Sequence, residues 1–361
     1  MKGSLAIAMG AALFAGAASL PLQAAAKPSP AKAVYKPTRN AFGQPDFSGN
    51  WSNVSMTPES RPAAIKGATY SPEEARRLEK IDTQAAEESD KPIDPSVGLP
   101  KVGGDAPIPG TRPEFVAAGG GTGGYDRGWL DPGNGFMRVN GEARTSILTT
   151  PDGRAPKMIN GKTEPARAPG LGGMDNPEDR PLGDRCLQFG RNAPAPMMGN
   201  GFYNNDYQIV QTKDEVGIYV EVIHDVRHIR LNGTHRTDGV RTWMGNSVGH
   251  YEGDTLVVET INLPKQQAYH GSWENLVVTE RFTRKGPDRR HYAFTIHDPT
   301  TWAADWGGEY EFHPLKGQLY EYACHEGNYA LEHILAGARE AEKRVKVAAR
   351  GSEGGGRSRN R

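Results

Sequence analysis

The sequence has little cysteine, no net charge and no long apolar run beyond its first residues, and each shortage narrows what the protein can be. Lysine plus arginine and aspartate plus glutamate each number 43, so no overall field attracts nucleic acid or an anionic membrane. After residue 26, no segment approaches the roughly 20 apolar residues that a membrane-spanning helix needs. We therefore expect neither a nucleic-acid partner nor a stable membrane span; a protein partner stays an open question.

The first 26 residues are typical of a secretory signal peptide. They open with Lys2, continue through an apolar stretch at residues 5–20 and end on Ala24-Ala25-Ala26. The apolar stretch is short and rich in alanine and glycine, which favours cleavage after Ala26 over a membrane anchor. The sequence therefore predicts a periplasmic or secreted protein.

The two cysteines, Cys186 and Cys324, are predicted to form a disulfide. In an oxidising compartment, an isolated pair favours a disulfide over two free thiols or a metal site. Closing so long a loop stabilises a fold by about 5 kcal/mol in the chain-entropy model. The bond would tie the start of the C-terminal domain to its last predicted strand.

Composition divides the chain into a loop-rich part and a strand-rich part. The 45 glycines and 27 prolines, with a mean hydropathy of −0.64, predict that much of the chain is loop. Residues 27–185 form this loop-rich N-terminal region, with one helix near residues 71–88. Ser71, Pro72 and Glu74 mark its start, as a capping box with proline at the first helical position. Residues 350–361 have no apolar side chain and predict a disordered basic tail.

From residue 205 the chain becomes a series of short runs rich in β-branched and aromatic residues, separated by turn sequences. Eight strands are predicted, at residues 207–212, 216–231, 241–251, 255–261, 276–284, 290–297, 309–313 and 318–324. Short turns between successive strands favour an antiparallel up-and-down sheet that closes into a barrel. We therefore expect residues 186–349 to be a mainly β domain, an eight-stranded meander that forms a lipocalin-like barrel. A helix from Asn328 to about Ala348 follows, with an apolar stripe suited to dock on the barrel.

Several segments resemble the signature motifs of a large family of uncharacterised exported bacterial proteins. They are DFSGNW at residues 46–51, WMGNSVG at 243–249, EGDTLVV at 252–258, ERF at 280–282, DP at 298–299 and YACHEGN at 322–328. The resemblance covers residues 46–51 and most of residues 186–339. It implies an exported protein and carries over no activity. The Gly-x-Trp at residues 49–51 and the strand meander are also similar to lipocalin-type barrels.

The strand predicted at residues 216–231 has the densest group of reactive side chains. Because side chains alternate along a strand, one face is apolar while the other presents Tyr219, Glu221 and Arg227. We predict that these residues bind a small molecule, a saccharide or an aromatic compound, with Trp243 and Trp302 as flat platforms. The alternatives are a structural ion pair between Glu221 and Arg227 and core packing of the tryptophans. No cofactor is expected.

Two other functions stay open. A cofactor-free hydrolase, lyase or isomerase would use His224, His325 and Glu326 as proton-transfer groups, and would need them to converge in one concave site. An envelope scaffold would wrap a protein partner with the glycine- and proline-rich connection of residues 89–185.

Two patterns suggest chemistry that their context does not support. Residues 245–249 match the Gly-x-Ser-x-Gly pattern around a nucleophilic serine, here Ser247. The residues that follow predict a β-hairpin, whereas that nucleophile needs a strand-to-helix elbow. His224 and His228 share a face of the predicted strand at a spacing of roughly 13 Å, too far apart for one ion. No metal site is predicted.

Overall fold

The computed structural model describes residues 35–89, 133–161, 173–199 and 205–355. The predicted signal peptide at residues 1–26 lies outside these ranges, and so does the end of the predicted tail, residues 356–361. All elements named below belong to one compact unit within Lys36–Arg361.

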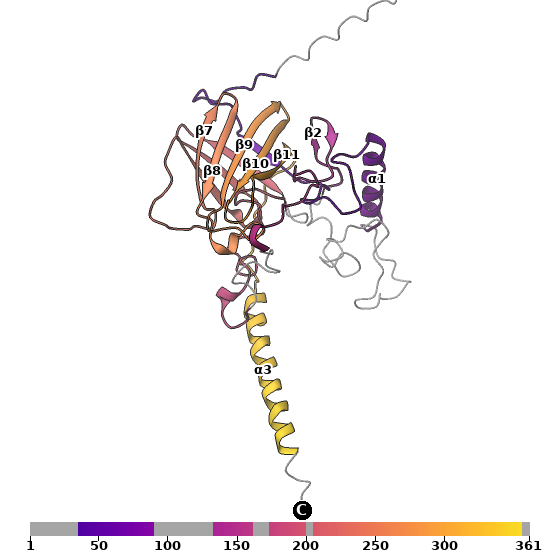
Figure 1. The fold of residues 1–361 in the computed structure, drawn as a ribbon, viewed down its shortest axis with the longest axis vertical. Helices are drawn as coiled ribbons and strands as arrows, with labels where there is room; N and C mark the ends of the chain where they lie inside the picture. Colours follow the sequence, from indigo (N-terminus) through magenta and orange to yellow (C-terminus); the bar gives the residue numbers. More distant parts are fainter. Residues whose placement is uncertain (1–34, 90–132, 162–172, 200–204, 356–361) are drawn as a thin grey trace, which may run out of the picture. The chain divides into compact units, whose positions relative to one another are not determined.

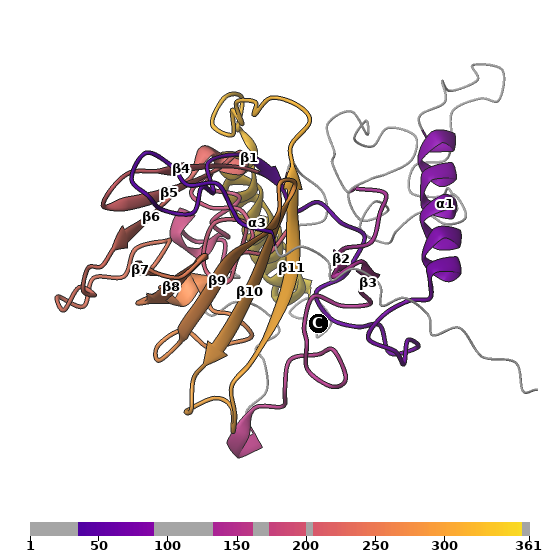
Figure 2. The ribbon, with the colours of Figure 1, turned by 90° about the horizontal axis from the view of Figure 1, so that it is seen from above.

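The architecture is a closed barrel of nine strands (Figures 1 and 2). The strands are β1 (Gly49–Ser52), β4 (Asp206–Gln211), β5 (Glu215–Val220), β6 (Val226–Leu231), β7 (Asn246–Glu252), β8 (Thr255–Ile261), β9 (Val277–Gly286), β10 (Arg289–His297) and β11 (Trp306–Pro314). Strand β1 closes the barrel because it pairs antiparallel with both β4 and β11. The DFSGNW segment, separated from the other barrel strands by residues 53–205, thereby removes the two sheet edges.

The single strand predicted at residues 216–231 is wrong. Strands β5 and β6 are two antiparallel partners, with Ile218 opposite Arg227 and Tyr219 opposite Val226. Between them the chain reverses through Ile223 and His224, which both have positive φ angles, 63° and 50°. This chain reversal divides the residues that we expected on one continuous strand between β5 and β6.

The antiparallel meander also needs correction at β7. Strand β7 runs parallel to β6, with Ile229 opposite Ser247, so the barrel is mixed. Residues 232–245, part of which we expected to be strand, instead form the crossover connection that returns the chain to the start of β7. Arg241 holds this crossover by donating to the carbonyls of Leu263 (2.8 Å) and Glu274 (3.0 Å). Residues 318–324, predicted as the last strand, are irregular, because β1 takes the place beside β11.

Helix α1 (Pro72–Ser89) confirms the predicted helix near residues 71–88. The backbone N–H of Glu74 donates to the Ser71 hydroxyl at 3.1 Å, which is the predicted cap. Beside it lie the two short strands β2 (Arg138–Val139) and β3 (Glu142–Ala143), which pair with each other. Ala75, Phe136 and Ala143 form a small buried cluster separate from the barrel core.

Helix α3 (Ala330–Gly355) begins two residues later and extends further than predicted. Asn328 does not cap it; its side chain donates to the carbonyl of Asp184 and to the sulfur of Cys186. Leu331, Ile334 and Leu335 are only half-buried, so the predicted stripe lacks the close packing that we expected. Residues 350–355 continue the helix, because elongating a helix is far less costly than starting one.

The predicted disulfide between Cys186 and Cys324 is confirmed, with the two Cα atoms 5.7 Å apart. It ties the segment before β4 to the irregular stretch before α3. Within the ranges that the structure covers, no helix has the length and apolar character needed to cross a bilayer.

Candidate functional site

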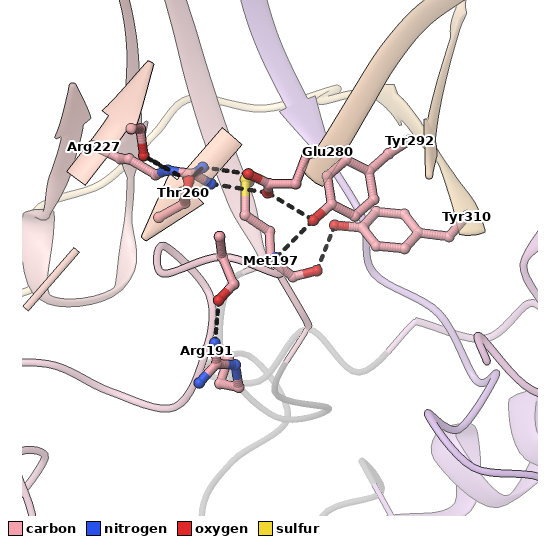
Figure 3. Close-up of polar contacts among 9 residues, drawn as sticks. Arg191, Met197, Arg227, Thr260, Glu280, Tyr292 and Tyr310 are labelled. Carbon is pink, nitrogen blue, oxygen red and sulfur yellow. Dashed lines mark hydrogen bonds and ion pairs between the residues drawn. The ribbon is translucent and has the colours of Figure 1, made fainter. Parts of the chain in front are cut away.

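A buried ion pair between Arg227 and Glu280 lies inside the barrel (Figure 3). Both side chains are fully buried, and the guanidinium makes two hydrogen bonds to the carboxylate. The remaining guanidinium donors reach the hydroxyls of Ser247 (3.1 Å) and Thr260 (2.8 Å). Burial disfavours the guanidinium charge, but the Glu280 carboxylate outweighs that effect and raises the pKa of Arg227. Arg227 therefore keeps its charge, and the network joins side chains from the four strands β6, β7, β8 and β9.

Two tyrosines extend this network from the ion pair to the backbone of Met197 (Figure 3). The Tyr292 hydroxyl donates to Glu280 at 2.8 Å and accepts from the Met197 N–H at 2.8 Å. The Tyr310 hydroxyl donates to the Met197 carbonyl at 2.9 Å. Burial raises the pKa of both phenols well above its ordinary value, so both hydroxyls keep the protons that they donate.

Met197 belongs to residues 191–198, a segment of the chain that lies inside the barrel and that we call the inserted segment. Ala193 and Ala195 are fully buried, and Met197 is 1% exposed. Arg191 anchors the segment: its guanidinium donates to the carbonyls of Gln267 and Ala195 and lies 4.7 Å from the centre of the Tyr269 ring. The space that a lipocalin-like barrel offers to a ligand is therefore filled here by residues 191–198 and by aromatic side chains.

The predicted ligand-binding residues do not share one pocket. Arg227 is buried inside the barrel. Tyr219 lies on the neighbouring strand β5, where its half-buried side chain points to the outer face of the sheet. Glu221 is buried in the reversal between β5 and β6. The partner of Arg227 is Glu280 and not Glu221, so the alternative ion pair between Glu221 and Arg227 is not formed.

The two predicted aromatic platforms differ from each other. Trp302 is a core residue, 2% exposed, whose indole N–H donates to the Pro156 carbonyl at 3.2 Å and whose ring meets Trp306 edge-on. Trp243 is half-buried and lines a pocket on the outer face of the barrel. Of the predicted ligand-binding residues, Trp243 is the one in that pocket.

This outer pocket has a volume of about 520 Å³, within the usual range for small-molecule sites. It lies between the outward side chains of β6 and the crossover of residues 232–245. Its walls are Glu215, Asp225, Val226, His228, Arg230, Arg236, Val240, Thr242, Trp243, Met244, Gly245, Asn246 and Ser247. Val226 and Val240 are 42% and 45% exposed there, which leaves apolar surface uncovered.

Ser247 belongs to both the pocket and the buried network. It lines the pocket, yet its hydroxyl is bonded to Arg227 and, at 2.8 Å, to Thr260. A serine with these partners has no base to activate it, which fits the missing strand-to-helix elbow. The two glycines of the motif have structural roles. A Cβ on Gly245 would lie 2.8 Å from the Ile261 carbonyl oxygen, and one on Gly249 would lie 2.9 Å from the Ile229 side chain.

The predicted proton-transfer residues are not joined to one another. His224 is exposed, and its Nδ1 lies 3.3 Å from the Tyr322 carbonyl oxygen. His325 and Glu326 are exposed in the turn before α3. No hydrogen bond or ion pair between described residues connects these three side chains. Likewise, the described part of the chain contains no group of three or more His, Cys, Asp and Glu side chains placed to hold a metal ion.

Asp225 lies on the polar face of the predicted strand and lines the pocket, but it is not among the predicted ligand-binding residues. Burial raises the pKa of its carboxyl to about 6, and nearby His224 offsets only part of that effect. One carboxylate oxygen is buried and has no hydrogen-bond partner in the described ranges. The sequence places Asp225 on a polar strand face but does not indicate that its carboxylate is buried without a donor.

Glu280 was also missed, although the sequence does contain a signal for it. It lies between Val278 and Phe282 at the apolar parity of β9, where all three side chains point into the barrel. A carboxylate at such a position requires a buried partner, so the pattern was enough to predict an interior ion pair.

Comparisons with known proteins identify no similar protein. No family model matches the chain, and neither the curated proteins nor the solved structures include a match.

Proposed function

We propose that this protein binds a small organic molecule in the outer pocket between β6 and the crossover of residues 232–245. The observation that carries the proposal is the pocket itself: about 520 Å³, with exposed valines, a half-buried tryptophan and a carboxylate that lacks a partner. Monomeric surfaces seldom leave apolar side chains and an unpaired carboxylate together in one concavity, whereas ligand sites combine these features.

The barrel interior is a poorer candidate for the site. The inserted segment fills it, and the polar groups at its centre already bond to one another. A ligand there would have to displace residues 191–198 and leave the Arg227 and Glu280 charges without their present partners, which is costly. The hydrogen-bonded interior instead supports the outer wall of the pocket, through the bond from Arg227 to Ser247.

The enzyme and scaffold alternatives have less support. The three proton-transfer residues lack the convergence that acid-base catalysis requires. The scaffold interpretation depends on residues 89–185, much of which lies outside the described ranges.

Export and family membership belong to the same proposal. The disulfide and the signal-like N-terminus support a periplasmic or secreted location. The motif segments support membership of the exported bacterial family that they resemble.

A ligand screen with two matched tryptophan variants tests the site. Trp243 lines the pocket; Trp273 is also half-buried and packs under Arg241 of the same crossover, but does not line it. Compounds that raise the melting temperature of the wild type should lose this effect in Trp243→Ala and keep it in Trp273→Ala. Equal stabilisation of both variants by every hit would place the site elsewhere.

A further inference from the structure

The ionisable side chains around the outer pocket have hydrogen-bond partners, with one exception. The paired ones are Arg236 with Asp238, Arg230 with the Thr234 carbonyl, and His228 with Glu215. The exception is Asp225, whose side chain makes no hydrogen bond or ion pair with another described residue and has one oxygen buried. A carboxylate removed from water without a donor is costly, and a ligand that supplies positive charge would offset this cost.

The backbone that places Asp225 is strained, which points to a role beyond folding. Asp225 directly follows Ile223 and His224, whose φ angles of 63° and 50° lie in the left-handed region. A β-branched residue such as Ile223 seldom adopts this conformation. The buried Ile223 side chain, 3% exposed, and the hydrogen bond from the Val220 N–H to the Asp225 carbonyl (2.8 Å) hold the turn in place. Strain of this kind is concentrated at ligand-binding and active sites.

The remaining wall of the pocket is apolar and includes an aromatic ring. Val226 and Val240 expose their side chains into it, and Trp243 and Met244 complete it. An indole face attracts organic cations as well as flat apolar groups. One wall of the pocket therefore suits an apolar body, while Asp225 suits a positive charge.

We propose that the ligand of the outer pocket is an organic ammonium ion, a protonated amine joined to an apolar, ring-containing body. The ammonium group lies against Asp225, and the ring lies against Trp243 and the two valines. This assignment rests on the proposed function and adds the chemical class of the ligand.

Three probes that share one apolar body test the class: 4-phenylbutylamine, 4-phenylbutanol and 4-phenylbutanoate, titrated by calorimetry into the full chain. We expect the amine to bind the wild type at least about tenfold more tightly than the alcohol or the acid, as a partly desolvated charge pair allows. Asp225→Asn should remove this preference. Asp288→Asn should retain it, because Asp288 is exposed in the β9–β10 turn and does not line the pocket. Melting curves of both variants show that they fold.

Three results would overturn the class. They are equal binding of the alcohol or the acid, persistence of the amine preference in Asp225→Asn, and failure of all three probes to bind the wild type. None of them decides the proposed function, because the tryptophan comparison uses a library without regard to charge. Only compounds that raise the melting temperature of Trp243→Ala as much as that of the wild type would remove the pocket as a binding site.

Discussion

Arg227, sealed inside the barrel, donates a 3.1 Å hydrogen bond to the hydroxyl of Ser247, a residue that lines the outer pocket. The bond joins β6 to β7, the one parallel pair of the barrel. The pocket is thus built on a wall that the buried ion pair fixes from the inside, so changes to the interior should affect both stability and the shape of the pocket.

Glu280→Gln should destabilise the fold by about 3–5 kcal/mol, because it leaves the buried Arg227 charge without its counter-ion. Glu252→Gln is the matched control: its partner Arg281 neighbours Glu280 on β9, but both members of that pair are about half exposed. The control should cost much less, because solvent screens an exposed ion pair. Urea unfolding of both variants measures the difference, and similar losses would mean that the interior pair contributes no more than a surface pair.

Asp225→Asn should stabilise the protein at pH 7 and lose this advantage in acid. The folded-state pKa of Asp225 is about 6, above the ordinary 3.8, so the folded state binds the proton more tightly than the unfolded state. The contribution of Asp225 to stability is therefore fully present below pH 3.8 and is lost as the pH rises through 6. Asparagine has no such dependence. The melting temperature of the variant minus that of the wild type should rise between pH 4 and pH 7, and a flat difference would show that Asp225 is not buried as described.

Tyr292→Phe should cost about 1–3 kcal/mol, because it leaves both a Glu280 oxygen and the Met197 N–H without their hydroxyl partner. It should also loosen the inserted segment locally. Native-state hydrogen exchange would show this as faster exchange of the Met197 amide relative to amides in the middle of β9. Unchanged protection of Met197 would mean that packing alone, and not Tyr292, holds residues 191–198.

Replacing both cysteines by serine should lower stability by up to about 5 kcal/mol, since Cys186 and Cys324 are 138 positions apart in the chain. Reductant should bring the wild type to the stability of the double variant and leave the variant unchanged. Equal denaturation midpoints of oxidised wild type and variant would contradict this.

The sequence was enough to predict a barrel, because strand periodicity and turn residues are local features of the chain. The capping box that predicts helix α1 is local too. The sequence predicted most strand positions, helix α1 and the disulfide. It did not reveal that β1 closes the barrel or that β7 is parallel to β6, because both depend on pairings between distant segments.

The candidate site was harder to predict for the same reason. Ile223 and His224 have left-handed backbone conformations and reverse the chain within the predicted strand. Tyr219 and Arg227 therefore lie on two strands and on opposite sides of the sheet. Only Trp243 of the predicted ligand-binding residues lines the outer pocket. Asp225 matters because no donor in the described part of the chain reaches its buried carboxylate oxygen, and a local sequence pattern does not predict the absence of a donor.

Methionine methyl NMR tests the central claim, that the ligand site lies outside the barrel and not within it. Met244 lines the outer pocket and Met197 fills the interior, so their labelled methyl groups report on the two alternatives in one spectrum. Titration with a compound that stabilises the wild type should shift the Met244 resonance and leave that of Met197 in place. A shift of Met197 with Met244 unchanged would place the ligand inside the barrel and contradict the account.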